Sequence, residues 1–523
     1  MSTQHPPRQG PRYTRRDLLR FGGLAVPALG ASWLLAGCGG PSAASAAGNV
    51  LRVTQSEDPK TLDPQKQGDM PSMNVLINMF DTLTSRDQRN RLAPRLALSW
   101  ASLDEHTWRF RLRPGVRFHN DEPCDANAVK FSLERLLDPS TASPIVELRY
   151  VAGATVIDQH TVDVHTSQPD PILPAKVSLF GGVIVPPNYL DRVGSDGFAR
   201  EPVGTGPFRF ESWERDHELR LRANPTHWSG KPALSGLVFR PMPNPASALA
   251  ALQSDEVDLV ANLTPDAARQ LDGYAGVTID SYPGIRTAYL SLNTEDGPLR
   301  DRRVRRALNH AVDVPLLIDA VLDGKAREVP TMIPRESFGF DDSVTPFTRD
   351  VALAKRLLAE AGYPDGFDTT LTASNDDAQV AQAISGLLRK AGIRASVNLL
   401  DPGTYSDRLT SDNRAALGPI YLAASTGWTV DGQSNVQSNV RRDRRQSRWR
   451  SREADQLIDA QELSTSDSER LRAFGRLQRL LKEEAPFVYL YQLDSIFARN
   501  DRPRWRPNVV GSLNMASAEV TDG

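Results

Sequence analysis

The sequence has little that would suit a metal ion or a nucleic acid. Its 523 residues include two cysteines and eight histidines, and no two histidines have the spacing of metal ligands. His119, which lies in Arg117-Phe118-His119-Asn120-Asp121, is expected to be a turn residue. The formal net charge is −2, whereas a chain that binds nucleic acid usually has a basic body. The sequence therefore predicts no metal site, no cofactor and no nucleic-acid partner.

Recognisable catalytic motifs are also lacking. There is no Gly-x-Ser-x-Gly elbow and no His-Glu-x-x-His pair. The segment from Gly204 to Phe208 has the glycines of a phosphate loop, but Pro207 lacks an amide hydrogen and the residues after it predict a strand, not a helix. We therefore expect a binding protein and not an enzyme. Two other classes stay open: an exported two-lobed hydrolase, which would cleave added peptides, and a membrane-linked sensor or chaperone-like peptide binder.

No run of residues is long and apolar enough to span a bilayer. The mild apolar stretch from Phe21 to Gly37 is too short, and it follows the adjacent pair Arg15 and Arg16. A basic region before such a stretch is typical of an export signal, here residues 1–37, and the paired arginines indicate twin-arginine export. The mature chain would then lose five arginines and one aspartate, so its net charge shifts from −2 to −6.

The end of this stretch, Leu34-Leu35-Ala36-Gly37-Cys38, resembles the lipobox of bacterial lipoproteins. The resemblance implies that Cys38 carries a diacylglycerol and becomes the new amino end, so the protein is anchored to a membrane through lipid on the periplasmic or extracellular face. Residues 38–48 would form a flexible tether. Only Cys124 then remains, so no disulfide can form within the chain.

The first half of the chain has the pattern of antiparallel strands. Alternating apolar and charged residues predict a hairpin over 106–119, turning at Pro114-Gly115. A helix is expected over 125–137, and strands around 154–165 and 205–223.

The second half changes to an α/β pattern. A strand at 369–373, a helix from Val380 to Ala391 closed by Gly392, and a strand over 393–400 predict a βαβ unit with parallel strands. Another amphipathic helix is expected over 351–361. Since a chain of this length exceeds the size at which one core keeps growing, two lobes are expected.

Eight segments, in this order, resemble the family 5 extracytoplasmic solute-binding proteins, the dipeptide, oligopeptide and nickel binding components of bacterial import systems. They are Thr61-Leu62-Asp63-Pro64, the run from Thr107 to His119, the run from Val203 to Phe208, the run from Asn224 to Pro232, Leu290-Ser291-Leu292-Asn293, the run from Arg303 to Leu308, the run from Glu360 to Phe367, and Glu483-Glu484-Ala485-Pro486.

The resemblance implies an α/β fold, a two-lobed clamp like the type II periplasmic binding proteins, with an extra subdomain in the first lobe. The first lobe would hold 49–285 and a C-terminal return, 487–523, and the second lobe would hold 286–486. The apolar runs Thr287–Asn293 and Phe487–Gln492 would cross between them. A monomer is expected, closing on a short peptide or similar small solute and docking on the permease of an ABC importer in the cytoplasmic membrane.

Peptide-binding relatives have a Gly-Trp-x-x-Asp pattern, found here from Gly427 to Asp431. The resemblance implies that Asp431 binds the α-ammonium of a peptide, in an open cleft where its carboxylate is solvated, and that Trp428 forms a pocket wall. The alternative is that Asp431 is only a turn residue before a glycine. Met70 and Met73 are expected to line the cleft, or else to fill the core.

The sequence departs from the peptide binders directly after this pattern. Gln433-Ser434-Asn435 follows where an Asp-Pro pair is common, which leaves a nickel chelate or another non-peptide solute as the alternative ligand. A histidine near this loop would favour nickel, but none lies between His310 and the C-terminus. Seven arginines within 441–452 form either a surface paired with aspartates or a rim that attracts acidic solutes.

Overall fold

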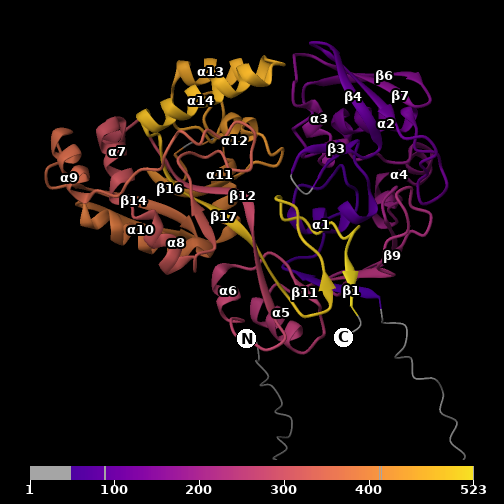
Figure 1. The fold of residues 1–523 in the computed structure, drawn as a ribbon. Coiled ribbons are helices and arrows are strands. Elements are labelled where there is room, and N and C mark those ends of the chain that lie inside the picture. The colour runs from indigo at the N-terminus through magenta and orange to yellow at the C-terminus, as the bar shows by residue number, and fades with distance from the viewer. Residues whose placement is uncertain (1–48, 88–89, 412, 414, 522–523) are drawn as a thin grey trace, which may run out of the picture. The chain divides into compact units, whose positions relative to one another are not determined.

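The computed structural model of this chain describes residues 49–87, 90–411, 413 and 415–521, which belong to one unit (Figure 1). The predicted export signal with Arg15 and Arg16, the lipid-bearing Cys38 and the tether 38–48 lie outside the described residues. Within the described part of the chain, no helix is both long enough and apolar enough to cross a bilayer.

Two long antiparallel strands run through the centre of the main sheet. They are β12 (Thr278–Leu292) and β17 (Phe487–Arg499), which pair along most of their length with an irregularity near Pro283 (Figure 1). Both predicted crossing runs, Thr287–Asn293 and Phe487–Gln492, fall largely within these strands, which extend well beyond them into the first-lobe part of the chain. The main sheet is therefore continuous between the two parts.

The remaining strands of the main sheet flank this central pair. Beyond β12 lie β16 (Ile420–Thr426), β14 (Phe367–Ser374) and β15 (Ile393–Leu400). Beyond β17 lie, in order, β11 (Leu259–Val260), β1 (Val50–Gln55), β10 (Gly236–Pro241), β9 (Glu218–Ala223) and β8 (Phe208–Glu214), and β13 (Ala326–Glu328) also pairs with β17.

Three smaller sheets complete the strands. The largest is antiparallel, in the order β4 (Ala97–Asp104), β5 (Thr107–Leu112), β7 (Thr161–Thr166) and β6 (Val151–Asp158). The other two are the pairs β2 (Thr84–Arg86) with β3 (Leu92–Pro94) and β18 (Pro503–Arg504) with β19 (Glu519–Val520).

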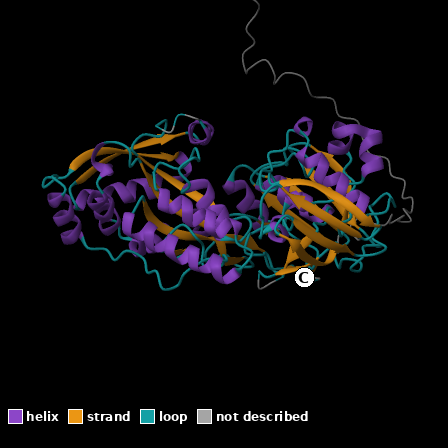
Figure 2. Ribbon diagram, turned by 90° about the horizontal axis from the view of Figure 1, so that it is seen from above, coloured by secondary structure: helices purple, strands orange, loops and turns teal. Residues whose placement is uncertain are grey.

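Helices accompany the strands in both parts of the chain (Figure 2). Those before the crossing strand β12 are α1 (Met70–Met79), α2 (Ala126–Leu137), α3 (Leu173–Lys176), α4 (Pro187–Arg200), α5 (Pro245–Gln253) and α6 (Pro265–Arg269). Those after it are α7 (Arg302–Ala311), α8 (Val314–Val321), α9 (Val351–Glu360), α10 (Ala378–Lys390), α11 (Pro402–Thr410), α12 (Gly432–Asn439), α13 (Arg452–Leu463) and α14 (Asp467–Glu484).

The βαβ unit predicted in the second half is present. β14 and β15 pair in parallel along their full length, and α10 connects them. Gly392 follows α10 with φ 95°, a conformation that costs glycine little, and this ends the helix before β15 begins. The helix predicted over 351–361 is also present, as α9.

The predicted hairpin over 106–119 is wrong. β5 is a strand, but it pairs with β4 and β7, and the residues after Gly115 do not return along it. Val116 and Phe118 instead bond the backbone of Cys124 and Glu122 and bury their side chains in the core. Alternation shows that a segment is a half-buried strand, but it does not show which strand it pairs with.

Separate hydrophobic cores lie on the two sides of the crossing strands. One set of buried side chains comes from residues 51–271 and 497–518, and another from residues 288–491. Among the buried clusters of the described residues, one draws on both parts, and it contains Met73, Ile285, Val430 and Val510. Of the residues expected to line the cleft, Met73 is a buried member of this cluster.

Candidate functional site

The loop from Gly427 to Asp431 connects β16 to α12 and is tied to the crossing strand β12. The Gly427 amide donates to the carbonyl of Ile285 on β12 at 3.4 Å, and the Val430 amide turns back to the Gly427 carbonyl at 2.7 Å. A Cβ at Gly427 would lie 2.6 Å from Oδ1 of Asn435, so only glycine allows this close approach to α12. The loop is therefore positioned by its own helix and by β12.

Val430 has a left-handed backbone conformation, with φ 52°. This is unfavourable for a β-branched residue and persists only where surrounding contacts impose it. Here Phe338 supplies them, because its amide donates to the Val430 carbonyl at 3.1 Å and its carbonyl accepts from the Gly432 amide at 2.9 Å. Such strain clusters at binding sites, so this loop is a candidate on backbone grounds alone.

The structure brings three of the four predicted ligand residues together. Trp428 and Met70 are partly buried and pack against the cluster that contains Met73 and Val430. We call this group the Trp428 cluster; its members are Met70, Met73, Phe180, Ile285, Trp428, Val430, Val509 and Val510. Met73 is 4% exposed and fills the core, whereas Met70 and Trp428 keep part of their surface accessible.

Helix α1 presents the two methionines from the first part of the chain. Asp69 caps it, because its side chain accepts from the Ser72 amide at 2.9 Å, and Pro71 occupies the first turn, where no amide donor is needed. Met70 and Met73 lie three positions apart and so share one face of the helix.

Asp431 does not have the solvated carboxylate that was expected. It is 4% exposed, and Nη2 of Arg470 lies 2.9 Å from Oδ1 and 2.8 Å from Oδ2. Its Oδ1 also accepts from the Gln433 amide at 3.0 Å and caps α12. The expectation of a free carboxylate is wrong because α14 brings Arg470 beneath the loop, a contact between residues 39 positions apart.

Arg470 is itself held firmly in the second part of the chain. Its guanidinium lies over the ring of Phe338, 4.6 Å from the centroid, and 5.7 Å from that of Phe474. Its Nε donates to the carbonyl of Gln461 at 3.0 Å. The pair between Asp431 and Arg470 is therefore a buried ion pair supported by aromatic packing.

Sequence reasoning missed a second arginine at this loop. Arg86, at the end of β2, donates from Nη2 to the carbonyl of Thr429 and from Nη1 to the carbonyl of Asn90 at 2.7 Å. Burial lowers the pKa of its guanidinium, and the charge of Asp431 opposes that shift. No sequence signal pointed to Arg86, because 343 positions separate it from its partner Thr429.

His119 and the glycine segment after Val203 have structural roles. Nδ1 of His119 accepts from the Gly204 amide at 3.3 Å, and Nε2 donates to the Gly206 carbonyl at 3.0 Å. Burial lowers the pKa of His119 to about 4. The strand predicted after Pro207 is present as β8.

Four of the seven arginines between 441 and 452 fit the first of the two predicted arrangements, a surface paired with acidic residues. The ion pairs are Arg441 with Asp459, Arg442 with Asp455, Arg444 with Asp443, and Arg450 with Glu295. Arg448 is buried, donates to the Gly418 carbonyl and lies 5.6 Å from the ring centroid of Tyr421.

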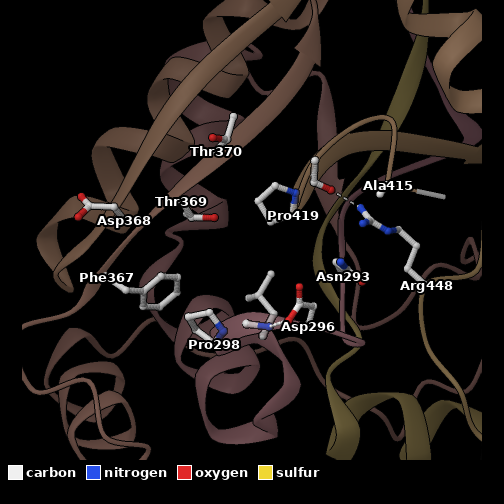
Figure 3. A pocket seen from close by; sticks show the side chains of 13 residues that line it. Asn293, Asp296, Pro298, Phe367, Asp368, Thr369, Thr370, Ala415, Pro419 and Arg448 are labelled. Atoms are coloured by element: carbon white, nitrogen blue, oxygen red, sulfur yellow. Dashed lines mark hydrogen bonds between the residues drawn. The ribbon is translucent and has the colours of Figure 1, made fainter. Parts of the chain in front are cut away.

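A pocket of about 380 Å³ lies away from the Trp428 cluster (Figure 3). Phe367 and Thr370 of β14, Pro298 and Arg448 form parts of its wall, and no member of the Trp428 cluster lines it. Figure 3 marks with a dashed line a hydrogen bond from the Arg448 side chain, which donates to the Gly418 carbonyl. The pocket is therefore distinct from the predicted site. In the described part of the chain, no group of three or more acidic, histidine or cysteine side chains is arranged to hold a metal ion.

The chain is similar to proteins of known structure and function. The "Glutathione-binding protein GsiB" of Shigella flexneri is 28% identical over 464 residues, which cover 86% of this chain and 90% of that protein. The periplasmic binding protein DppA from Helicobacter pylori, solved with the peptide STSA, is 25% identical with a TM-score of 0.76 and covers 90% of this chain and 98% of its own.

A third match concerns the fold. The ABC transporter substrate-binding protein CtaP from Listeria monocytogenes is 22% identical, with a TM-score of 0.83 over 91% of this chain and 100% of that one. These neighbours confirm the predicted α/β, two-lobed fold of the type II periplasmic binding proteins. The family description "Bacterial extracellular solute-binding proteins, family 5 Middle" matches residues 91–445. This chain therefore belongs to the family 5 bacterial extracellular solute-binding proteins.

Proposed function

We propose that this protein captures a short peptide, or a similar small solute, at the Trp428 cluster and delivers it to the permease of an ABC importer. The observation that carries the proposal is the meeting of Trp428 and Met70, from the two parts of the chain, beside Ile285 on a crossing strand. Two relatives support the solute class, since GsiB is named for glutathione and DppA was solved with a peptide.

The residues of the cluster suit such a ligand. Trp428 offers a rigid aromatic face and Met70 a flexible thioether, and both keep accessible surface beside buried apolar neighbours. Clefts between lobes are common ligand sites. Such sites are lined mostly by apolar and aromatic side chains, as this cluster is.

Asp431 is proposed as the partner of the peptide's α-ammonium. Its carboxylate would either be shared with Arg470 or pass from Arg470 to the ammonium. Nη2 of Arg470 already occupies both carboxylate oxygens, so an incoming ammonium would have to displace it or bind a remaining lone pair. Acetylating the amino end of the peptide should therefore reduce the binding free energy by less than it would if Asp431 had no arginine partner.

Calorimetry with a panel of tripeptides tests the proposed function. Wild type should bind at least one peptide, and Trp428→Ala should weaken that binding by at least about tenfold, because removing an aromatic anchor from an interface typically costs about 2 kcal/mol or more. Tyr274→Ala, which removes an aromatic side chain that is 45% exposed, is the control and should bind as wild type does. Binding of a nickel–histidine chelate in place of every peptide would favour the nickel alternative, and release of peptide fragments would favour the hydrolase.

We also propose that the protein is exported by the twin-arginine route and anchored through lipid on Cys38, as its first residues predict. Cys38→Ala should release the protein from membranes in cell fractionation. Arg15→Lys combined with Arg16→Lys should leave precursor in the cytoplasm. A soluble wild type would overturn the anchoring, and normal processing of the double variant would indicate the general secretory route.

A further inference from the structure

The loop from Gly427 to Asp431 has more positive than negative charge around it. Asp431 is already paired with Arg470, while Arg86 reaches the same loop from β2. Arg86 has no ion pair with any carboxylate of the described residues, and its two hydrogen bonds go to backbone carbonyls. Two guanidinium groups thus face one carboxylate, which leaves one positive charge without a counter-charge in contact.

The donors of Arg86 are not all used. A guanidinium has five N–H donors, and the bonds to Asn90 and Thr429 occupy one on Nη1 and one on Nη2. Nε is buried and has no hydrogen-bond partner. The residue is only partly buried as a whole, and its bond to the Thr429 carbonyl places its guanidinium at the loop that carries Trp428.

Other polar groups near this loop are also unpaired. Oε1 of Gln433 and Oδ1 of Asn435, on the first turn of α12, are buried without a hydrogen-bond partner, as is Nε2 of Gln461 beneath Arg470. Unsatisfied buried polar atoms are rare in folded proteins. The two oxygens are acceptors, so they call for a donor and not for a carboxylate. By contrast, Arg441, Arg442, Arg444 and Arg450 have acidic partners.

We propose that the solute carries a carboxylate that binds the guanidinium of Arg86, so that the site selects acidic solutes. This inference rests on the proposed function, because it assigns a substrate class to the same site. A carboxylate there would neutralise the uncompensated charge and accept charge-assisted hydrogen bonds from the hydrogens of Nη1 and Nη2 that Asn90 and Thr429 leave free. The carboxylate can belong to a side chain or to the carboxyl end of a peptide, and the experiment distinguishes these sources.

The experiment uses three matched pairs of tripeptides that differ in one carboxylate: Glu-Ala-Ala with Gln-Ala-Ala, Ala-Ala-Glu with Ala-Ala-Gln, and Ala-Ala-Ala with its C-terminal amide. Calorimetry measures each pair with wild type, Arg86→Gln and Arg91→Gln. Arg91 is the matched control, because its side chain is 70% exposed and pairs with Asp87.

Wild type and Arg91→Gln should bind the acidic member of at least one pair about 10- to 100-fold more tightly than the neutral member, the usual range for a hydrogen bond to a charged group. In Arg86→Gln this ratio should fall to about threefold or less. An equal ratio in wild type and Arg86→Gln, or no preference in wild type, would overturn the inference and leave the proposed function standing. Failure of wild type to bind any tripeptide would overturn the proposed function, and this inference with it.

Arg86→Lys provides a second test if Arg86→Gln does not fold. Lysine keeps the charge but lacks the planar fork of donors, so the ratio should drop below that of wild type without vanishing. A ratio unchanged from wild type in Arg86→Lys, measured on folded protein, would also count against the assignment.

Discussion

Asp431 and Arg470 are single residues whose effects cannot be separated. Each is almost fully buried, and the pair has side-chain exposures of 6% and 4%. In such a pair the attraction offsets the cost of removing both charges from water. Removing either partner leaves the other as a buried charge without compensation. The acidic residue of the Gly-Trp-x-x-Asp pattern therefore contributes to folding.

We expect Asp431→Asn to lower the free energy of unfolding by about 3 kcal/mol or more, because it leaves the Arg470 charge buried and unpaired. Asparagine can still cap α12, so the change isolates the loss of charge. Urea unfolding followed by circular dichroism measures it.

Asp368→Asn is the control for this measurement. Asp368 pairs with Arg394 on the surface, with side-chain exposures of 80% and 48%. Loss of this ion pair should lower the free energy of unfolding by less than about 1 kcal/mol. Equal costs for the two substitutions would mean that the Asp431 pair contributes no more than a surface pair.

His119 makes stability depend on pH. The folded protein keeps its ring neutral down to about pH 4, since the pKa is lowered to about 4, whereas the unfolded chain takes up the proton near pH 6.5. Between these values the unfolded state binds more protons, so stability is present at pH 7 and is lost as the pH falls toward 4. Protonation of Nδ1 would also remove the acceptor of the Gly204 amide.

His119→Gln should reduce this loss by up to about 3 kcal/mol between pH 7 and pH 4. The amide of glutamine has both a donor and an acceptor but does not titrate in this range. Urea unfolding at several pH values gives the slope. His217→Gln is the control: it changes a side chain that is 66% exposed, and the free energy of unfolding should vary with pH as in wild type. The same pH dependence in His119→Gln as in wild type would show that His119 does not cause the loss of stability.

At the scale of secondary-structure elements, the glycines before β8 allow a close contact with the end of α1. The Gly206 amide donates to the Met79 carbonyl at 2.8 Å, and a Cβ at Gly204 would lie 2.0 Å from that same oxygen. The segment that looked like a phosphate loop is thus a packing contact between a helix end and a strand start. The helix in this contact, α1, is the one that carries Met70.

Gly204→Ala should destabilise the protein by on the order of 3 kcal/mol, because the methyl group overlaps a backbone oxygen that cannot move freely. The measurement is the thermal or urea midpoint of purified protein. Gly386→Ala in α10 is the control: the space around Gly386 is open, so alanine should be neutral or stabilise the helix by up to about 1 kcal/mol. A Gly204→Ala protein as stable as wild type would show that the Met79 contact is loose in solution.

For the whole molecule, a solute that contacts both parts of the chain should favour a closed form. We expect a tripeptide that binds in calorimetry to raise stability by about 2.7 kcal/mol at 100 times its Kd, and so to raise the thermal midpoint. Small-angle scattering should show a smaller radius of gyration with that peptide than without it. An unchanged radius at saturation would contradict closure, and a peptide that does not bind serves as the control.

Much of the fold could be predicted from local pattern. The βαβ unit from β14 to β15 and helix α9 follow from apolar periodicity and from Gly392, because these signals report burial on one face of a short segment. The crossing runs within β12 and β17 were expected from the family resemblance. The meeting of Trp428, Met70 and Met73 was anticipated from the family resemblance and not from periodicity.

The contacts of the site were decided by the tertiary structure alone. Nothing near Asp431 in the sequence indicates Arg470, and nothing near Thr429 indicates Arg86, since these partners lie 39 and 343 positions away. The partner of β5 was mispredicted for the same reason. The sequence by itself determined the βαβ unit, helix α9 and the family that the chain resembles, because these depend on local pattern and on ordered segments. Which charges are neutralised depends on distances between remote side chains, which exist only after the chain has folded.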